Sequence, residues 1–192
     1  MDAVRRAAPA IDPMALIALM RRLLGPEGTL LMPTFPFRGR EEEFIRTDPL
    51  FNPRRTPSRV GLLTELFRRL PEARRSLHPT HPVAGIGPRA DFLLGEHHRG
   101  RTYGPTSPFY RLRDCGGRVV GLGTQTESFT IQYVPEELHP RCRNLVFHPD
   151  PVPMPVLDGD QRLTCLVYPK KALVDYANVY RAQEILRIEG LM

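Results

Sequence analysis

Cysteine is scarce in this chain of 192 residues. The sequence contains three, Cys115, Cys142 and Cys165, which are widely spaced and include no Cys-x-x-Cys pair. An odd number without paired spacing excludes a disulfide framework and argues against a thiol-rich zinc site. We therefore expect isolated, reduced thiols and no metal.

Long hydrophobic runs are also missing. No apolar stretch approaches the roughly 20 residues that a membrane-spanning helix needs. The first residues, "MDAVRRAAPAIDP", contain no apolar core of a secretory signal. With 41% hydrophobic residues, the composition is instead typical of a soluble globular protein. We expect a cytoplasmic protein with no membrane partner.

Lysine is nearly absent, since Lys170 and Lys171 are the two lysines among 27 basic residues and the other 25 are arginines. The net charge is +6. A basic chain suits a nucleic acid or a polyanionic cofactor. The arginines form scattered pairs rather than one dense stripe. We expect no nucleic-acid partner, with a basic nucleic-acid-binding domain kept as an alternative.

The hydrophobic pattern alternates between helices and strands. The clearest helix is "IDPMALIALMRRLLGPEG", in which Asp12 can cap the first turn, Pro13 suits the first position and Gly25 ends the helix. Ser58 would cap a second helix. Helices are predicted at 58–71, 88–98, 107–117 and 176–190, strands at 29–33, 82–87, 118–123 and 162–169, and a long loop at 34–57. This alternation predicts an α/β fold in a single domain spanning residues 1–192.

Two histidines in "RRSLHPTHPVAGIGPRA", His78 and His81, are three residues apart, and each is followed by a proline. The residue before a proline is pushed toward extended conformations, in which side chains three apart point to opposite faces. A zinc site would also need a third ligand, and the nearby pair His97-His98 looks exposed. The pattern favours a stiff segment that leads into a strand over a metal site.

Two common catalytic motifs are absent. The sequence has no Gly-x-Ser-x-Gly elbow for nucleophilic catalysis and no Gly-x-Gly-x-x-Gly loop for a dinucleotide. Ser107 in "GPTSPF" lies at a predicted helix start, where backbone N–H groups can hold an anion. The same residue can equally be an ordinary helix cap.

Several blocks of the sequence together resemble one known family. They are "GPEGTLLMPTF", "FNPRRTPSRVGLLTELFRRLPEARRSLHPTHPVAGIGPRA", "YGPTSPFYRL" and "GGRVVGLGTQTESFTIQYVPEE". Their order and spacing, from about Gly25 to Glu137, are similar to those of the aminoglycoside 3-N-acetyltransferase (antibiotic N-acetyltransferase) family. The segment with His78 and His81 then resembles the family's Arg-Ser-x-His-Pro segment, which leads into a central strand.

The resemblance implies a three-layer α/β/α fold with a central mixed sheet. It also implies acetyl-coenzyme A as co-substrate and a small-molecule amine, an aminoglycoside or related amino sugar, as acceptor. In this family a histidine removes a proton from the attacking amine, because a protonated amine is not a nucleophile. Carboxylates hold the sugar, since anionic side chains stabilise a substrate with several ammonium groups.

Residue roles follow from the matching motifs. The family's Thr-x-x-His-x-x-Glu motif reads "TIQYVPE" here, so Thr130 would bind substrate, Tyr133 takes the position of the histidine and Glu136 is the catalytic carboxylate. With a one-residue shift, Gln132 takes that position instead, and His139 lies just beyond the motif. Free tyrosine titrates near pH 10 and glutamine does not titrate, so neither replaces an imidazole at neutral pH.

Binding residues are carried over in the same way. The resemblance assigns Ser76, His78 and Ser107 to coenzyme A and Asp48, ahead of "FNP", to the acceptor, with Glu41–Glu43 as an alternative acidic group. The family begins with a strand and a helix that contain a His-Ser-Ser part of the coenzyme A site, and we expect this chain to lack them. The missing histidine and segment support a second hypothesis, a catalytically inert remnant or binding protein that keeps the fold.

Overall fold

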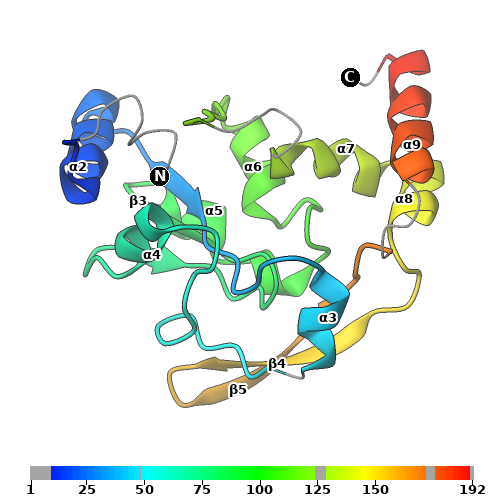
Figure 1. Ribbon diagram of the computed structural model, residues 1–192, viewed down its shortest axis with the longest axis horizontal. Helices are drawn as coiled ribbons and strands as arrows, with labels where there is room; N and C mark the ends of the chain where they lie inside the picture. The colour runs from blue at the N-terminus through cyan, green and yellow to red at the C-terminus, as the bar shows by residue number, and fades with distance from the viewer. Residues whose placement is uncertain (1–9, 48, 124–128, 172–175, 191–192) are drawn as a thin grey trace.

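The order of helices and strands follows the expected alternation. The computed structural model describes residues 10–47, 49–123, 129–171 and 176–190 (Figure 1). The helices are α2 (Pro13–Leu24), α3 (Glu41–Arg46), α4 (Leu62–Arg68), α5 (Ala90–Leu94), η1 (His97–Arg99), α6 (Pro108–Asp114), η3 (Thr130–Gln132), α7 (Tyr133–Leu138), α8 (Pro140–Val146) and α9 (Tyr176–Ile188). The strands are β1 (Leu30–Pro33), β2 (Arg74–Arg75), β3 (Val83–Ile86), β4 (Val152–Asp158) and β5 (Gln161–Val167). The predicted α/β class is confirmed.

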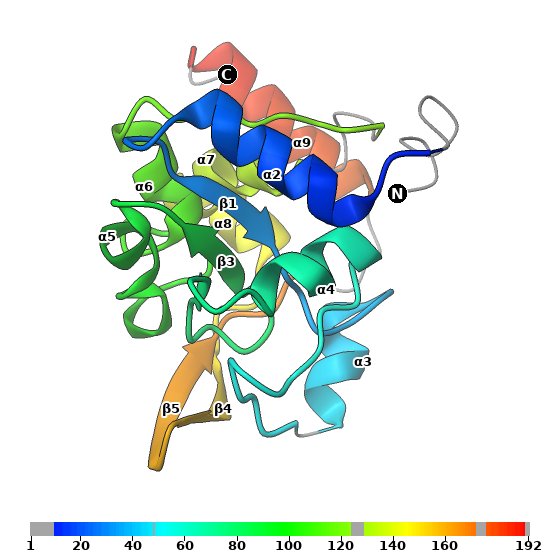
Figure 2. The same cartoon turned by 90° about the vertical axis from the view of Figure 1, so that its left-hand side faces the viewer.

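A three-stranded sheet with the order β1-β3-β2 separates two helical layers. β3 is its central strand and pairs antiparallel with β1, with Leu30 opposite Ile86. Successive side chains of a strand point to opposite faces. Ala84 and Ile86 therefore pack with the α2 and α4 side, while Val83 packs with α5. Figure 2 shows α2 and α4 lying against β1 and β3, as the predicted three-layer arrangement requires.

A separate hairpin of β4 and β5 lies at the other end of the molecule from α2 (Figure 1). Its register runs from Val152 opposite Val167 to Asp158 opposite Gln161. Phe51 adds an isolated parallel bridge to the middle of β4. Within the described ranges the named strands pair antiparallel, so the three-stranded central sheet is antiparallel where a mixed sheet was expected, and the parallel bridge of Phe51 belongs to the separate hairpin.

The α2 helix forms as its sequence predicts. The side chain of Asp12 accepts a hydrogen bond of 2.9 Å from the N–H of Ala15, and Pro13 occupies the first turn. Gly25 follows the last helical residue with a φ of 71°, which glycine adopts without a steric cost. The buried Ile17 then packs against the sheet. Capping and burial thus agree on where α2 begins and which face it buries.

Three other predictions about elements need correction. The loop at 34–57 contains the short helix α3. α4 begins at Leu62 after Gly61, so Ser58 is not its cap; the N–H of Ser58 instead donates to the carboxylate of Glu65 over 2.7 Å. Residues 118–123 form no strand, and Val120 is 75% exposed, so the apolar run has no neighbouring layer to bury it.

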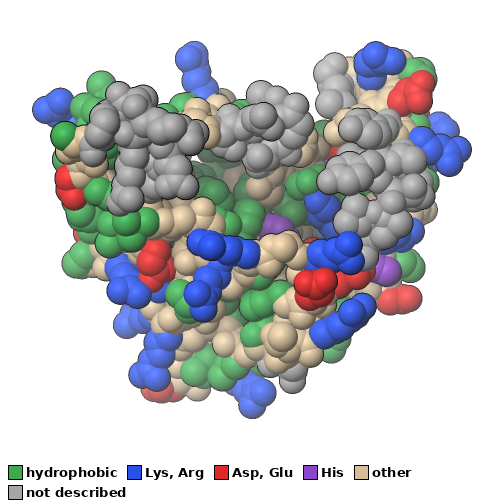
Figure 3. All heavy atoms as spheres, viewed as in Figure 1, with side chains coloured by type: hydrophobic (Ala, Val, Ile, Leu, Met, Phe, Trp, Pro, Cys, Tyr) green, Lys and Arg blue, Asp and Glu red, His purple; other side chains and the backbone are tan. Residues whose placement is uncertain are grey.

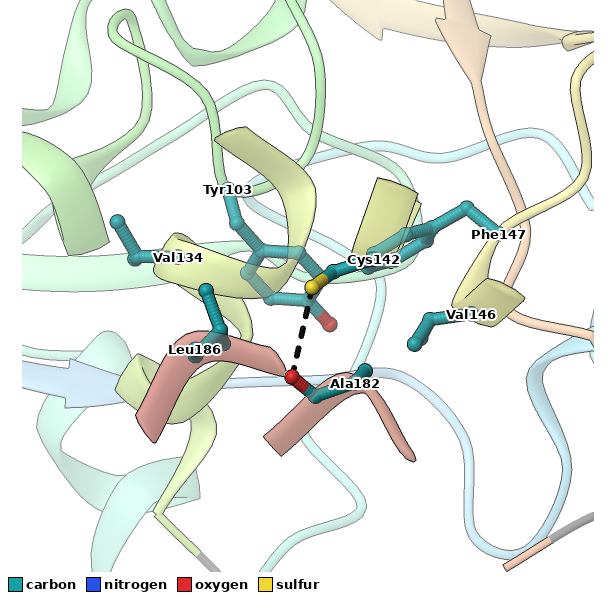
Figure 4. Close-up of a cluster of buried hydrophobic side chains, with 7 residues drawn as sticks. All are labelled: Tyr103, Val134, Cys142, Val146, Phe147, Ala182 and Leu186. Carbon is teal, nitrogen blue, oxygen red and sulfur yellow. Dashed lines mark hydrogen bonds between the residues drawn. The ribbon is translucent and has the colours of Figure 1, made fainter. Parts of the chain in front are cut away.

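The helices α7, α8 and α9 share a hydrophobic cluster with Tyr103 (Figure 4). The other members of this cluster are Val134, Cys142, Val146, Phe147, Ala182 and Leu186. The thiol of Cys142 donates to the carbonyl oxygen of Ala182 over 3.4 Å, which ties α8 to α9. Tyr103 belongs to the segment that follows η1, so this cluster joins the C-terminal helices to the middle of the chain. No helix among the described residues has both the length and the apolarity to cross a membrane.

Candidate active site

The turn between β2 and β3 places four polar side chains inside the protein. Ser76, His78, Thr80 and His81 are each at most 6% exposed. Buried polar groups are stable only when they are hydrogen-bonded. The N–H of His81 donates to Nδ1 of His78 over 3.2 Å, which closes the turn and brings both histidines to one side, with ring centroids 6.2 Å apart. The turn thus differs from the extended segment that the sequence predicted.

One histidine of the predicted exposed pair is part of the same network. His97 is fully buried and stacks on His78, with ring centroids 4.5 Å apart. Its Nε2 lies 2.9 Å from the carbonyl oxygen of Thr102 and must donate, so Nδ1 accepts from the hydroxyl of Ser76 over 3.0 Å. Nε2 of His78 lies 3.2 Å from the hydroxyl of Thr102. The two imidazoles are therefore neutral and fully hydrogen-bonded.

Burial explains why these two imidazoles stay neutral. It lowers the pKa of His97 to about 3 and the pKa of His78 well below its usual value. The side chains of His78 and Ser76 are occupied by partners inside the protein. Both residues hold the turn in place, and their assignment to coenzyme A remains a prediction.

His81 occupies a different environment, between the turn and helix α3. Its Nδ1 lies 3.3 Å from Oε1 of Glu41, an ion-pair distance rather than an aligned hydrogen bond, and 3.0 Å from the hydroxyl of Thr80. The other oxygen of Glu41 accepts from the N–H of Lys170 over 3.2 Å. Burial raises the pKa of Glu41, but the attraction of His81, Thr80 and that N–H outweighs it and holds the pKa below its usual value. His81 and Glu41 thus form a buried imidazole–carboxylate pair, with the carboxylate on the Nδ1 side of the ring.

Aromatic rings fix the plane of the His81 imidazole. Phe35, Phe37 and Tyr103 meet it edge-on, with ring centroids 4.6, 5.6 and 5.4 Å away. The backbone N–H of Tyr103 donates to one oxygen of Glu137 over 2.5 Å, and Nε of Arg101 lies 3.1 Å from the other. Glu137 thereby anchors the segment that carries Tyr103 to α7.

The predicted catalytic residues lie on α7, beside this group. The ring of Tyr133 is 5.3 Å from that of Tyr103, and Nζ of Lys170 lies 3.5 Å from its centroid. The carboxyl group of Glu136 is buried and has no hydrogen-bond partner among the described residues. Burial raises the pKa of Glu136 to about 7, which the charge of Lys170 only partly offsets. The structure thus places Tyr133, on the same helix as Glu136, against Tyr103, which in turn contacts His81.

The remaining predicted residues do not all join this group. Ser107 is a buried helix cap whose hydroxyl accepts from the N–H of Tyr110, so the interpretation as an ordinary cap is confirmed. Thr130 is half-buried at the start of η3. Asp48 lies outside the described residues. Of the alternative acidic residues, Glu41 lies against His81. The feature of the sequence that could have pointed to Glu41 is its place shortly after Phe35 and Phe37, which also contact His81.

An open hollow of about 520 Å³ lies beside Phe37, one of the aromatic rings that contact His81. Phe37 and Phe44 line it, stacked at 5.4 Å, together with Arg38, Arg40 and Arg59. The space-filling view shows a recess on one face with a histidine side chain in it and Lys or Arg side chains at its edge (Figure 3). In the part of the chain that the structure describes, no three His, Cys, Asp or Glu side chains are placed to hold a metal ion.

A family model described as aminoglycoside 3-N-acetyltransferase matches residues 8–192. The chain belongs to this family. It is 34% identical over 133 residues to aminoglycoside N(3)-acetyltransferase IV from Salmonella sp., covering 69% of this chain and 48% of that protein. It is 32% identical over 141 residues to aminoglycoside N(3)-acetyltransferase VII from Streptomyces paromomycinus, covering 66% of this chain and 48% of that one. The chain spans about half the length of the curated relatives it matches.

Solved structures share the fold. A structure described as AAC-IIIb in binary complex with CoASH superposes with a TM-score of 0.69 at 22% identity, covering 93% of this chain and 71% of that one. A mutant of AAC(3)-IVa in complex with a gentamicin superposes with a TM-score of 0.67 at 24% identity, covering 93% and 63%. These similarities confirm the antibiotic N-acetyltransferase-like α/β fold that the resemblance implied.

Proposed function

We propose that this chain carries an acetyl-coenzyme A-dependent N-acetyltransferase activity on the amine of an aminoglycoside or related amino sugar. The Glu41–His81 pair beside an open hollow is the observation that supports it. Family membership supplies the reaction class, and the relatives' structures with CoASH and a gentamicin support the two small-molecule partners. The two residues that match the family's histidine position, Tyr133 or with a one-residue shift Gln132, are not histidines, so in this proposal another residue supplies the base.

His81 is the base that the geometry supports best. Its Nδ1 faces Glu41 and Thr80, and its Nε2 forms no hydrogen bond or ion pair with another described residue, so Nε2 can accept a proton. The amine nitrogen then attacks the thioester carbonyl carbon, His81 takes the amine proton, and the carbon–sulfur bond breaks. The coenzyme A thiolate leaves and takes the proton back from His81. Glu41 stabilises the imidazolium that exists between these steps.

Tyr133 has a different role in this proposal. Its ring face is occupied by the ammonium group of Lys170, a cation–π contact that orders both side chains. We assign Tyr133 to positioning Lys170, whose backbone N–H holds Glu41. Glu136 remains a candidate proton carrier because its carboxyl group titrates near neutrality.

Substitution of His81 tests the proposal. His81→Asn should lower kcat for acetyl transfer to an aminoglycoside panel, followed as released thiol, by roughly 10²–10⁴-fold, the usual contribution of a general base. His148→Asn is the matched control, because His148 pairs with Glu42 over 2.7 Å, neither residue lines the hollow, and the change should affect kcat little. Thermal unfolding of each variant shows that it is folded.

Two outcomes contradict parts of the proposal. If His81→Asn keeps the wild-type kcat, His81 is not the base, and Glu136 becomes the next residue to substitute. If the wild-type chain acetylates no amine of the panel, the inert-remnant hypothesis replaces the enzyme. One observation favours that alternative, since neither Tyr133 nor Gln132, the two residues that match the family's histidine position, is a histidine.

A further inference from the structure

Three buried side chains near His81 have oxygen atoms without a hydrogen-bond partner among the described residues. They are Glu41, Tyr103 and Glu136, each at most 9% exposed, and the atoms are Oε1 of Glu41, the hydroxyl of Tyr103 and both carboxyl oxygens of Glu136. A buried polar group without a partner lowers stability. Such groups in a folded protein commonly serve a chemical role or hold internal water.

Tyr103 lies between His81 and helix α7. The centroid of its ring is 5.4 Å from that of the His81 imidazole and 5.3 Å from that of the Tyr133 ring on α7. Among the described residues, no other ring that contacts His81 also contacts Tyr133. Figure 4 shows the Tyr103 side chain reaching from its loop into the cluster of residues from α7, α8 and α9. Tyr103 is therefore the side chain that connects the surroundings of His81 with those of α7.

Carboxyl groups act on the Tyr103 hydroxyl from both sides. Burial raises the pKa of Tyr103 well above its usual value, and negative charge on Glu41 and on Glu136 raises it further, so both carboxyl groups lie within electrostatic reach of the hydroxyl. The ammonium group of Lys170 and the thiol of Cys142 on α8 lie within similar reach of Glu136. The hydroxyl therefore stays protonated between two carboxyl groups, and a protonated hydroxyl both donates and accepts hydrogen bonds.

We propose that the hydroxyl of Tyr103 links His81 to Glu136 as a carrier of protons, with internal water completing the contacts. When His81 has taken the amine proton at Nε2, its Nδ1 proton passes to Oε1 of Glu41, 3.3 Å away. The Tyr103 oxygen accepts this proton as its own proton passes to the carboxylate of Glu136. Each N–H or O–H bond that breaks is replaced by one that forms, and the same path returns the proton when the coenzyme A thiolate takes the Nε2 proton. Tyr103 acts through His81 rather than on the substrate, and the inference rests on the proposed N-acetyltransferase function.

The ionisation of Glu136 tests the link without requiring turnover. Carbon-13 NMR follows the carboxyl signal of Glu136, identified by its loss in Glu136→Gln, as the pH is raised, and the wild-type midpoint should lie at about pH 7. Tyr103→Phe should move this midpoint to higher pH, because the ionised carboxylate loses a hydrogen-bond donor. Tyr110→Phe is the matched control, since it removes the hydroxyl of a tyrosine on α6 that is not among the unpartnered groups, and it should leave the midpoint unchanged.

Kinetics then test whether protons travel along the link. At pH 8, Tyr103→Phe should lower kcat for acetyl transfer by roughly tenfold or more, a part of the roughly 10²–10⁴-fold that assisted proton transfer contributes. Glu136→Gln should cause a similar loss, and the double variant should lose no more than either single variant, because all three interrupt one path. Tyr103→Phe should not lower the free energy of unfolding, because it removes an unpartnered buried hydroxyl and keeps the ring. A lower kcat in an equally stable variant separates the link from a structural role.

Two results would overturn the inference. One is a Glu136 midpoint that is the same in the wild type and in Tyr103→Phe, whether or not the chain is an enzyme. The other is a shifted midpoint together with a kcat that Tyr103→Phe leaves unchanged, because the groups would then interact without passing a proton. If the midpoint shifts as expected and the wild type acetylates no amine of the panel, the link between Tyr103 and Glu136 stands and the proposed function fails.

Discussion

The carboxyl group of Glu136 is buried, and it has no hydrogen-bond partner among the described side chains and backbone groups. A charged group in that position is destabilising, so the folded protein holds its proton up to about pH 7. The unfolded chain releases the same proton near its ordinary pKa. The cost of ionisation is therefore fully present above pH 7 and disappears as the pH falls toward the unfolded value.

Removing the carboxyl group should stabilise the protein above neutral pH. Glu136→Met should increase the free energy of unfolding at pH 8 by roughly 2 kcal/mol more than at pH 5, because the wild type bears the ionisation cost only at the higher pH. Urea denaturation at the two pH values measures this difference. Glu27→Gln, at an exposed position, is the control. A gain that is equal at both pH values would mean that burial does not raise the pKa of Glu136.

At the scale of single residues, motif and environment carry different information. The motif "TIQYVPE" singles out Glu136, which lies on α7, but it carries no record of the packing of the Tyr133 ring against Tyr103. In the sequence His81 is only a candidate metal ligand, because its partner Glu41 lies 40 residues earlier. A contact between segments so far apart becomes visible only when the fold brings α3 against the turn.

At the scale of elements, a single close approach controls how β3 leaves the sheet. Gly87 follows β3 with a φ of 134°, a conformation that is nearly exclusive to glycine. A Cβ atom at this position would lie 2.6 Å from Cα of Thr29 and would also meet the carbonyl oxygen of Gly28. These backbone atoms directly precede β1, which is paired with β3, so they cannot move away without disturbing the sheet.

Gly87→Ala should therefore destabilise the protein strongly. We expect a loss of roughly 3 kcal/mol or more in the free energy of unfolding, from backbone strain and overpacking together. Gly116→Ala is matched for positive φ, with 65°, but has open space around the added carbon, so it should cost only about 1 kcal/mol. Equal losses in urea denaturation would contradict the close-approach argument.

Elements with a local signal are predictable from the sequence, and those that depend on neighbours are not. Asp12 and Ser107 mark the starts of α2 and α6 correctly because capping is decided within one turn of helix. The sequence does not indicate β4, because Pro153 and Pro155 break the strand pattern. The structure accommodates both prolines because β4 pairs with β5 on one side and, among the described residues, meets only the isolated Phe51 bridge on the other. No local pattern indicates which side of a strand stays open.

At the scale of the whole molecule, the buried histidines make stability depend on pH. His78 and His97 have lowered pKa values in the folded protein, whereas the unfolded chain binds their protons below about pH 6.5. The unfolded state then binds more protons than the folded one, so the free energy of unfolding falls as the pH decreases from about 6.5 toward 3. Glu136 acts in the opposite direction, because in the upper part of this pH range the folded protein binds its proton and the unfolded chain does not.

Acid should therefore destabilise the protein through His78 and His97, while the raised pKa values of Glu136 and Glu137 offset part of this loss. Each histidine contributes roughly 1.4 kcal/mol per pH unit within that window. Urea denaturation at pH 7, 6 and 5 measures the slope of the free energy of unfolding against pH. His78→Asn should reduce this slope by the contribution of one histidine. Gly87→Ala, which touches no histidine, should lower the whole curve without changing its slope. A slope that His78→Asn leaves unchanged would mean that His78 is charged in the folded protein.

The bond between Glu41 and the N–H of Lys170 joins residues 129 positions apart. During synthesis on a ribosome, the carboxylate of Glu41 emerges long before its partner, and the chain between them must close a large loop before the contact forms. Contacts of such high sequence separation slow folding. The turn with His78 and His81 can form early from local bonds, whereas the carboxylate behind His81 is secured only after β4 and β5 have been made. During translation, His81 is therefore made well before Lys170, whose N–H holds the carboxylate of Glu41 beside His81.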